Sequence, residues 1–492
     1  MLSEMKENCI EIRDVSFSYK ESSKASLYRV SLNIREGEVV VLCGESGCGK
    51  STLIRLINGL IPFYYQGELD GEVMISGRST KEGSIYDLGS KVSSVFQNPK
   101  SQFFCVDVRS ELAFGAENRN FDKTEILKRM DQVSHELKLG NLVDKTMFQL
   151  SGGEKQKIAC ASVSVTDNPI IVLDEPSSNL DMYAIVELKK IIDYWKQKGK
   201  TIVIAEHRLQ YLLNTADRFL YLKNGRITRE FHKDEIQQLP DGELKDMGLR
   251  TLSYHHLVIS NKKEATRFMT IRDFSFMYKG SQNPNLWIPE LKIPEASVIA
   301  VIGKNGAGKS TFVRCFCGLE KRAKGTLLTE SQSLRRKKRL EHSFLVMQDV
   351  NHQLFTESVD EEIILSMKKE DQGLLSELLK EFDLYDDRKR HPMSLSGGQK
   401  QRVAVASAVA SSRDYIIFDE PTSGLDCFHM KQVSGCMEKL QKQGKTIFVI
   451  THDLELIYSC CNYVLHMESG LAKELYPLNE ENESKLKTFF NV

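Results

Sequence analysis

Two glycine-rich stretches with the same spacing carry the clearest chemistry in this 492-residue sequence. The first reads GESGCGKST over Gly44–Thr52 (phosphate loop 1), and the second reads GKNGAGKST over Gly303–Thr311 (phosphate loop 2). Both fit G-x-x-x-x-G-K-[ST], in which backbone N–H groups surround phosphates, the lysine reaches the β- and γ-phosphates, and the hydroxyl ligates Mg²⁺. Each loop follows an apolar run, VVVLC or VIAVI, so we expect a strand before it and a helix after it.

Two Asp-Glu pairs could complete such sites. Asp174 and Glu175 end the run IIVLDE, and Asp419 and Glu420 end the run YIIFDE. The aspartate could hold Mg²⁺ through water, and the glutamate could polarise an attacking water as a general base. A strand-end aspartate can also simply cap the next helix, but the adjacent glutamate favours the metal-site interpretation.

A histidine follows the next apolar run in each half of the chain, His207 in IAEHRL and His452 in ITHDLE. A single histidine at such a place is more often structural. Its recurrence downstream of the acidic pair favours contact with a γ-phosphate. Gln97 in VFQN and Gln348 in VMQD also recur, but glutamines in polar loops are common and carry no assignment by themselves.

Two further repeated features have alternative interpretations. Tyr19 and Tyr278 could stack on adenine, because a planar ring suits a π-face, or they could be strand residues near a sheet edge. The sequence LSGG occurs at Leu150–Gly153 and Leu395–Gly398, each time before a long helical pattern. Its serine and glycines either cap a helix N-terminus or form another anion site.

The ordered motifs indicate that one unit is written twice. Lys50 matches Lys309 at an offset of 259 residues, and Asp174 matches Asp419 at an offset of 245. The runs EVVVLC, IIVLDE and TIVIAE recur as VIAVIG, YIIFDE and TIFVIT. Continuous β-branched runs of this kind predict the buried parallel strands of an α/β domain.

Composition and patterning set the domain organisation and exclude some functions. We predict domains at 8–230 and 267–492, joined by a polar linker at 231–266. Lys plus Arg and Asp plus Glu are both 67, so bulk charge does not suggest nucleic-acid or lipid binding. No apolar run reaches about 18 residues, the first residues are polar, and the 11 cysteines contain no C-x-x-C pair. We therefore expect a cytosolic chain with reduced thiols.

The full order of motifs resembles that of ATP-binding cassette ATPases: tyrosine, phosphate loop, glutamine, LSGG, Asp-Glu, S-x-L-D (Ser178–Asp181 and Ser423–Asp426) and histidine. The resemblance covers nearly the whole chain, twice. It implies tandem P-loop NTPase domains of α/β class, each with a mainly parallel sheet core, an antiparallel β subdomain and a helical subdomain carrying LSGG. It also implies hydrolysis of ATP with Mg²⁺ by two paired halves, the phosphate loop of one and LSGG of the other enclosing one ATP.

Both sites look complete by this resemblance, and the one visible weakening is Lys157 where the second copy has Arg402. We predict two competent sites. The candidate catalytic residues are Gln97, Glu175, His207, Gln348, Glu420 and His452. The candidate Mg²⁺ ligands are Ser51, Gln97, Asp174, Ser310, Gln348 and Asp419. The candidate nucleotide-binding residues are Tyr19, Gly44, Glu45, Ser46, Gly47, Cys48, Gly49, Lys50, Ser51, Thr52, Ser151, Gly152, Gly153, Tyr278, Gly303, Lys304, Asn305, Gly306, Ala307, Gly308, Lys309, Ser310, Thr311, Ser396, Gly397 and Gly398.

Cys48 lies inside phosphate loop 1, two residues before Lys50. It is either a small residue tolerated in a loop or, because of the helix N-terminus beside it, a thiol with a lowered pKa. We expect alkylation of this thiol to block the first site and ATP to protect it.

Two stretches of the first half, Ile57–Gly77 and Val95–Asn120, are similar to the ATPases of energy-coupling factor importers, and Val346–Ile364 echoes the second stretch. This resemblance implies an ATPase subunit that powers uptake of a vitamin or transition-metal ion at the cytoplasmic face of the cell membrane. Its partners would be a transmembrane coupling protein and a small substrate-binding membrane protein. Phe103 and Phe104 could form a docking surface or a buried packing element.

Two other functions remain open. One is a cytosolic twin cassette acting on the ribosome or another complex, and the other is the ATPase of a conventional ABC transporter. The short mixed linker and the lack of C-x-x-C pairs disfavour the twin cassettes of translation and DNA repair. No nucleic-acid partner is expected.

Overall fold

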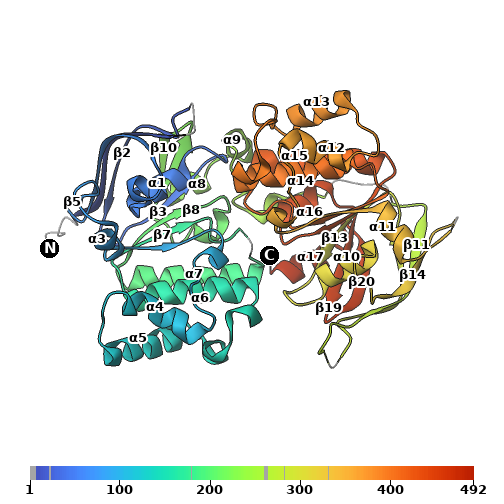
Figure 1. The fold of residues 1–492 in the computed structure, drawn as a ribbon, viewed down its shortest axis with the longest axis horizontal. Coiled ribbons are helices and arrows are strands. Elements are labelled where there is room, and N and C mark those ends of the chain that lie inside the picture. Colours follow the sequence, from blue (N-terminus) through green and yellow to red (C-terminus); the bar gives the residue numbers. More distant parts are fainter. Residues whose placement is uncertain are drawn as a thin grey trace. The chain divides into compact units, whose positions relative to one another are not determined.

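The computed structural model describes residues 7–20, 24–178, 180–259, 264–281, 283–330 and 332–491. The chain divides into two compact units, Met1–Leu252 (unit 1) and Ser253–Val492 (unit 2), each with its own sheets and helices (Figure 1). Within the described ranges, no helix is both long enough and apolar enough to span a bilayer.

Unit 1 contains two sheets. The antiparallel sheet has the order β2-β1-β4-β5 and consists of β1 (Asn8–Tyr19), β2 (Leu27–Arg35), β4 (Gly67–Ile75) and β5 (Arg78–Ser79). The larger sheet has the order β10-β9-β3-β8-β7-β6 and consists of β3 (Val39–Cys43), β6 (Val92–Val95), β7 (Ile170–Asp174), β8 (Thr201–Ala205), β9 (Arg218–Lys223) and β10 (Arg226–His232). Its pairings are parallel except that β10 runs antiparallel to β9.

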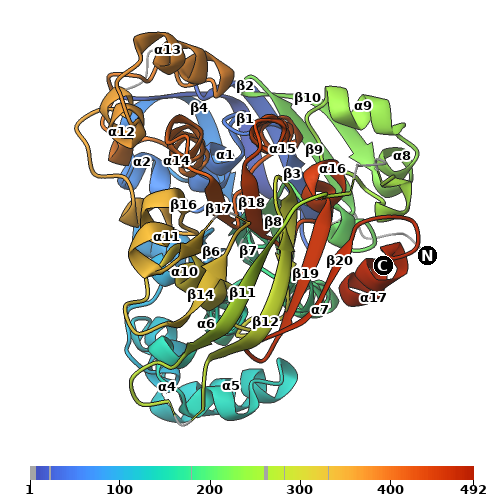
Figure 2. The same cartoon turned by 90° about the vertical axis from the view of Figure 1, so that its right-hand side faces the viewer.

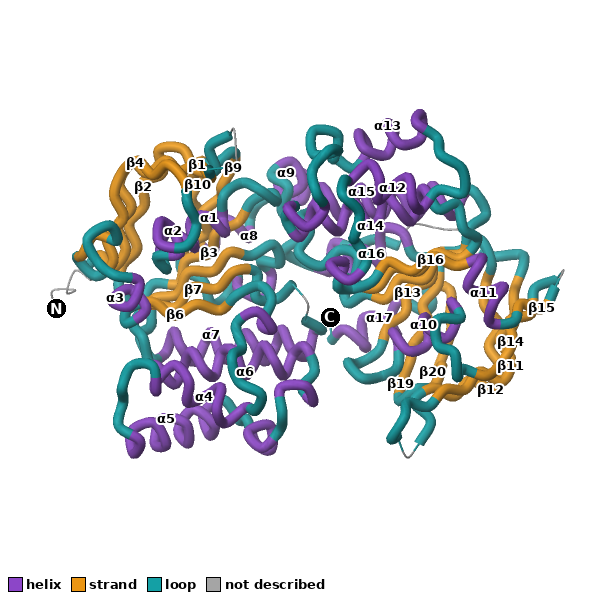
Figure 3. Tube along the Cα trace, in the orientation of Figure 1, coloured by secondary structure: helices purple, strands orange, loops and turns teal. Residues whose placement is uncertain are grey.

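Helices cover both faces of the larger sheet of unit 1 (Figures 1 and 3). Side chains alternate along β3, so Val40 and Leu42 pack with α1 and the antiparallel sheet, whereas Val39 and Val41 pack with α6 and α7. The helices of this unit are α1 (Lys50–Ile57), α2 (Leu60–Phe63), α3 (Ile85–Gly89), α4 (Val108–Glu117), α5 (Lys123–Glu136), α6 (Gly152–Thr166), α7 (Met182–Gln197), α8 (Lys233–Gln237) and α9 (Asp241–Asp246).

Unit 2 repeats this plan (Figure 2). Its antiparallel sheet, in the order β12-β11-β14-β15, consists of β11 (Phe268–Phe276), β12 (Leu286–Pro294), β14 (Lys324–Leu328) and β15 (Ser333–Leu334). Its larger sheet, in the order β16-β17-β18-β13-β19-β20, consists of β13 (Val298–Ile302), β16 (Ser343–Val346), β17 (Tyr415–Asp419), β18 (Thr446–Ile450), β19 (Tyr463–Glu468) and β20 (Leu471–Pro477). Its helices are α10 (Lys309–Cys317), α11 (Arg336–His342), α12 (Val359–Ser366), α13 (Gln372–Glu381), α14 (Gly397–Ala410), α15 (Cys427–Lys442), α16 (Leu454–Cys460) and α17 (Glu483–Phe490).

The predicted α/β fold class is confirmed in both units, and the strand burial explains why the sequence pattern was informative. Every residue of β3, β8, β13 and β18 is buried, as expected for parallel strands covered on two faces. Neighbouring parallel strands end at the same edge of the sheet, so the segments that follow β3, β7 and β8 meet there. This edge holds the candidate site of unit 1, and the ends of β13, β17 and β18 hold that of unit 2.

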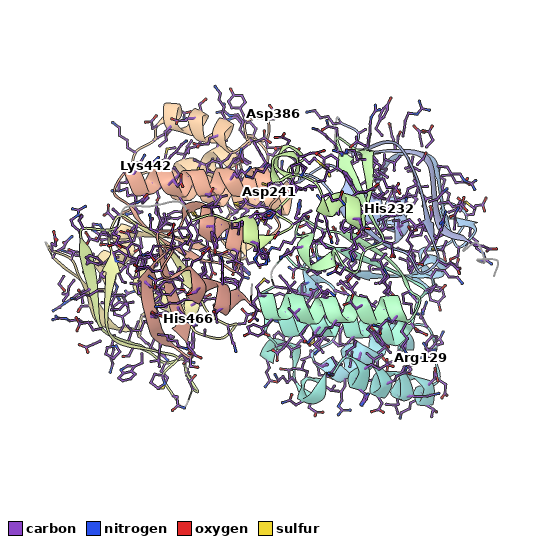
Figure 4. All side chains as sticks on the ribbon, turned by 180° about the vertical axis from the view of Figure 1, so that it is seen from behind. Arg129, His232, Asp241, Asp386, Lys442 and His466 are labelled. Atoms are coloured by element: carbon purple, nitrogen blue, oxygen red, sulfur yellow. The ribbon has the colours of Figure 1, made fainter. Side chains whose placement is uncertain are left out.

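The predicted linker at 231–266 differs from the structure in its first part. Residues 231–252 group with unit 1 and contain α8 and α9, whose beginnings lie near the labelled His232 and Asp241 in Figure 4. Apolar side chains spaced along this polar stretch, including Ile236 and Leu244, are buried in the core of unit 1. They escaped the sequence analysis because each helix is only five or six residues long. Residues 260–263 lie outside the described residues.

Candidate active site

Each phosphate loop joins a buried strand to a helix, as the sequence predicts. Phosphate loop 1 leaves β3 and enters α1, and phosphate loop 2 leaves β13 and enters α10. Gly44 has φ of 141°, and a Cβ there would lie 2.3 Å from the Leu222 carbonyl oxygen. Gly303 has φ of 154°, and a Cβ there would lie 2.4 Å from the Met467 carbonyl oxygen. Glycine is therefore required for each loop to pass this close to the neighbouring strand of the sheet, β9 in unit 1 and β19 in unit 2.

The lysine of each loop lies inside the loop. Lys50 is 4% exposed, and its Nζ donates to the carbonyl oxygens of Gly44 (3.0 Å) and Glu45 (2.9 Å). Lys309 is 8% exposed, and its Nζ donates to the carbonyl oxygens of Gly303 (2.7 Å) and Lys304 (3.2 Å). A buried ammonium group held by loop carbonyls is positioned to attract a polyanion such as the β- and γ-phosphates of a nucleotide.

Two of the three predicted Mg²⁺ ligands of unit 1, Ser51 and Asp174, are adjacent, whereas the third, Gln97, is hydrogen-bonded to Glu175. Ser51 Oγ donates to Asp174 Oδ1 at 2.9 Å. Burial, and next the neighbouring Glu175 carboxylate, raise the pKa of Asp174 to about 6, while the bond from Ser51 acts in the opposite direction. A bound cation would offset the buried carboxylate charge, and a hydroxyl with a carboxylate is a donor set that Mg²⁺ takes beside nucleotide phosphates.

Unit 2 has the same arrangement. Burial raises the pKa of Asp419, and a hydrogen bond from Ser310 and the charge of Lys309 act against this rise. The oxygen donors of Ser310 and Asp419 therefore fit Mg²⁺ in the same way as their counterparts in unit 1.

Glu175 is the centre of a group of predicted catalytic residues. Gln97 Nε2 donates to Glu175 Oε2 at 2.7 Å, and His207 Nε2 lies 3.3 Å from Glu175 Oε1. In unit 2, His452 Nε2 lies 3.6 Å from Glu420 Oε1. Both glutamates adopt the left-handed backbone region, with φ of 44° and 51°, which is uncommon for residues with a Cβ and clusters at functional sites.

A cavity of about 340 Å³ in unit 2 is lined by many of the predicted site residues of that unit. Its walls include residues 305–311 of phosphate loop 2 together with Tyr278, Gln348, Glu420 and His452, and also Asp419. These residues come from five separate segments of the sequence, so the fold alone brings them together. A volume of this size, with cationic, hydroxyl and carboxylate groups on its walls, suits a phosphorylated ligand.

Both predicted adenine-stacking tyrosines are anchored beside a phosphate loop. The hydroxyl of Tyr19 lies 3.2 Å from Thr52 Oγ1, and that of Tyr278 lies 3.3 Å from Thr311 Oγ1. Tyr19 is the last residue of β1, whereas Tyr278 follows the end of β11, and both strands lie inside their sheets rather than at an edge. Stacking on adenine stays a prediction.

Each unit also has an arginine near its candidate Mg²⁺ ligands that was not among the residues predicted from the sequence. Arg55 donates to the Tyr19 hydroxyl at 2.7 Å, and its positive charge opposes the rise in the pKa of Asp174. Arg314 has the same effect on Asp419. The two arginines are 259 residues apart, which is also the offset between the two phosphate-loop lysines, so the repeat itself contained the signal.

The LSGG serines are helix N-caps in the structure. Ser151 Oγ accepts the Glu154 amide of α6 (3.3 Å), and the Glu154 carboxylate accepts the Ser151 amide (2.8 Å). Ser396 and Gln399 form the same reciprocal pair at the start of α14. The capping interpretation is confirmed, and the anion-site interpretation stays a prediction.

The prediction of a lowered pKa for Cys48 is wrong. The thiol is 6% exposed, and its burial raises the pKa although Lys50 acts in the opposite direction. Desolvation of a thiolate outweighs the helix N-terminus and one nearby cation here. Of the two interpretations, that of a small residue tolerated in the loop fits the structure.

The sequence pattern of the ABC transporter family matches residues 27–178 and 288–423, once in each unit. The matched ranges include both phosphate loops and both Asp-Glu pairs. The chain therefore belongs to the ABC transporter family, as a protein with two ATP-binding cassettes, and it is an ATP-hydrolysing enzyme.

Relatives match along nearly the whole chain. A protein of Treponema denticola named as an ABC transporter ATP-binding protein is 42% identical over 98% of this chain and 100% of its own length. A protein of Clostridium perfringens with the same description is 33% identical over 94% of this chain and 89% of its own. The family assignment thus extends over both units and the segment that joins them.

Solved structures confirm the fold. A structure named RNase-L Inhibitor has a TM-score of 0.66 and 22% identity, covering 97% of this chain and 93% of its own. A chain from a model of ribosome-bound archaeal Pelota and ABCE1 has a TM-score of 0.68 and 22% identity, covering 96% of this chain and 80% of its own. At this identity the likeness concerns the tandem-cassette fold alone.

Proposed function

We propose that the chain is the ATP-hydrolysing subunit of an energy-coupling factor-type importer. It would power uptake of a vitamin or a transition-metal ion through separate membrane subunits, at the cytoplasmic face of the membrane. The observation that carries the proposal is a hydrogen-bonded connection from an exposed aromatic groove to the candidate base Glu175. An ATPase that drives a partner needs such a connection, because hydrolysis and partner movement must share one mechanical element.

The candidate site supplies the chemistry. The phosphate loop and its lysine bind the β- and γ-phosphates, and Mg²⁺, when bound beside Ser51 and Asp174, offsets phosphate charge. Glu175 orients and polarises the attacking water, and His207 faces the γ-phosphate from the adjacent strand end. Unit 2 performs the same steps with Glu420 and His452.

The groove lies in unit 1 beside the strand that leads to Gln97. It has a volume of about 320 Å³ and lies between β6 and helices α4 and α6, with Tyr86, Phe104 and Phe114 on its walls. Phe104 is 74% exposed and stacks on Phe114 with ring centroids 4.9 Å apart. An exposed, pre-ordered aromatic pair is the type of feature that anchors a partner helix or loop.

The segment between this groove and the site is held firmly. Gln102 Oε1 accepts the Phe96 amide at 3.2 Å, and Glu111 accepts the amides of Phe104 and Cys105 at 3.0 and 2.9 Å. Gln97 within the same segment donates to Glu175 at 2.7 Å. A partner that moves the groove would therefore move the hydrogen-bond donor of the candidate base.

Unit 2 carries an equivalent segment. Phe355 is 73% exposed, Gln353 Oε1 accepts the Met347 amide at 3.0 Å, and Glu362 accepts the Phe355 amide at 3.0 Å. Of the two phenylalanines of unit 1, Phe103 packs against the core and Phe104 is exposed, which supports a docking role for Phe104 alone. We propose Phe104 and Phe355 as equivalent docking anchors.

The stretch Ile57–Gly77 makes unit 1 different from unit 2. It adds α2 between α1 and β4, buries Ile61, and exposes Tyr64 to 73%. In unit 2, α10 ends at Cys317 and β14 begins at Lys324 with no such helix between them. Two units with unequal surfaces suit a membrane partner that presents two unequal docking elements.

The test is purification of the tagged chain from detergent-solubilised native membranes, with bound proteins identified by mass spectrometry. We expect a small polytopic protein and a second, coupling-type membrane protein to be retained by the wild-type chain. The double variant Phe104→Ala/Phe355→Ala should lose them by about tenfold or more. Tyr28→Ala, an exposed ring on the antiparallel sheet, is the matched control and should keep them. Recovery only from the soluble fraction, together with ribosomal proteins, would overturn the importer and leave the ATPase standing.

A further inference from the structure

We propose that Glu206 and Asp453 are positioning residues that hold the histidine of each unit beside its glutamate. They do so from opposite sides of the histidine, since Glu206 precedes His207 and Asp453 follows His452. The inference rests on the proposed ATP sites, in which these histidines face the γ-phosphate. Neither carboxylate belongs to the motifs that define the sites.

Glu206 connects two loops of unit 1. It is 2% exposed, and its Oε1 accepts the amides of His207 (2.7 Å) and Arg208 (3.1 Å). Its Oε2 accepts the Tyr211 hydroxyl (2.9 Å) and the Ser177 amide (3.4 Å). A buried carboxylate needs such donors, because its charge has left water.

One of the four donors to Glu206, the Ser177 amide, comes from a different loop than the others. Ser177 lies two residues after Glu175, in the turn that follows β7, whereas the other donors follow β8. Glu206 therefore ties the turn that carries the candidate base to the loop that carries the histidine. The 3.3 Å separation of His207 Nε2 and Glu175 Oε1 is the distance that this tie maintains.

Unit 2 makes the same tie with different residues. At the offset of 245, Thr451 stands in place of Glu206 and Asp453 in place of Arg208. Asp453 is 4% exposed, and its Oδ2 accepts the hydroxyl of Thr422 at 2.8 Å. Thr422 is the counterpart of Ser177, so a carboxylate again joins the turn after the glutamate to the loop with the histidine.

A helix-capping role alone does not account for Asp453. It does cap α16, since Oδ1 accepts the Leu456 amide at 3.3 Å and its own amide donates to Thr451 Oγ1 at 3.0 Å. The bond to Thr422 reaches a different segment, 31 residues away in sequence, and contributes nothing to the cap. Unit 1 forms only a short turn, Gln210–Leu212, after its histidine, yet it keeps the tie.

The two units also differ in which group accepts the hydrogen bond from the histidine amide. The His207 amide donates to Glu206 at 2.7 Å, whereas the His452 amide donates to Glu420 Oε2 at 3.4 Å. The histidine and glutamate side chains are also slightly farther apart in unit 2, 3.6 Å against 3.3 Å. The two sites share their motifs but differ in how the histidine loop is fixed.

Relocating the carboxylate within unit 1 tests the inference. Glu206→Thr breaks the tie, and Glu206→Thr/Arg208→Asp rebuilds it in the manner of unit 2. ATP turnover is measured in the full chain, in the wild-type background and with Glu420→Gln to isolate unit 1. We expect Glu206→Thr to lower kcat by about tenfold or more in the isolated unit, with KM for ATP changed by less than about twofold.

The rescue separates positioning from stability. The double variant should recover kcat to within about threefold of its parent, while the melting temperatures of single and double variants stay similar. Glu206→Gln keeps the size of the side chain and one acceptor oxygen, so its kcat should lie between those of the single and double variants. Equal kcat for Glu206→Thr and its parent, or a double variant no faster than the single one, would overturn the inference. If Glu175→Gln together with Glu420→Gln leaves turnover intact, the proposed sites themselves have failed instead.

Discussion

Replacing Asp174 by asparagine should stabilise unit 1 when neither Mg²⁺ nor nucleotide is present. Burial and the adjacent Glu175 carboxylate raise the pKa of Asp174 from 3.8 to about 6. At about 1.4 kcal/mol per pKa unit, the charged carboxylate costs the folded unit about 3 kcal/mol at neutral pH. Asparagine removes this charge, and its side-chain oxygen can still accept the hydrogen bond from Ser51 Oγ.

The pH dependence has a defined direction. The folded state binds the Asp174 proton more tightly than the unfolded state does, so the wild-type free energy of unfolding decreases as pH rises from about 4 to about 6. The advantage of Asp174→Asn is therefore full above about pH 6 and absent below about pH 4. Calorimetry in EDTA should show a melting temperature about 5–10 °C higher for the variant at pH 7.5, and no difference at pH 4.

A control and a ligand experiment can refute this reasoning. Asp14→Asn makes the same change where a hydrogen bond from Arg29 lowers the aspartate pKa, so it should not stabilise the protein. With Mg²⁺ and a non-hydrolysable ATP analogue, the wild type should gain more stability than Asp174→Asn, because the cation compensates the carboxylate. A variant that melts below the wild type at pH 7.5 without ligand would show that burial of this charge is not the dominant cost.

Three other outcomes follow from the sites. Glu175→Gln and Glu420→Gln should lower ATP turnover to a similar extent, because both units carry the same motif residues, and near-normal turnover in one beside complete loss in the other would contradict this. Ser151→Ala should cost about 1 kcal/mol in thermal or urea unfolding, because it removes an N-cap; an unchanged midpoint would argue against the cap. Cys48→Ala should retain ATPase activity, since Ala307 occupies the matching place, and the buried thiol should react slowly with iodoacetamide at pH 7.5; rapid labelling would contradict the burial of this residue.

The sequence predicted which segments lie together at the candidate site because the fold class limits where motifs can go. Gly44, Glu175 and His207 are far apart in the chain, but each follows a strand of a parallel sheet, and such strands end at one edge. The same motifs follow the corresponding strands in the second half of the chain, which supports the same prediction. In unit 1 the structure brings Gln97, Glu175 and His207 together.

What the sequence could not provide were the effects that depend on burial. Cys48 lies beside a helix N-terminus in sequence, but the sign of its pKa shift depends on how deeply the loop is packed. Residues 231–252 look polar as a string, yet a few apolar side chains at the right places dock them on unit 1. Glu206 resembles a surface residue until its four donors are seen.

The repeat also shows why matching motifs do not guarantee matching sites. The chemistry requires particular groups where the site contacts phosphate and water. The connection between the histidine loop and the turn after the glutamate requires only a buried carboxylate that can reach that turn. Either neighbour of the histidine can provide it, as Glu206 and Asp453 do. With the carboxylate on different sides of the histidine, the His207 amide donates to Glu206 and the His452 amide donates to Glu420. The histidine loop is therefore fixed through Glu206 in unit 1 and through Asp453 and Glu420 in unit 2, although the two units carry the same motifs.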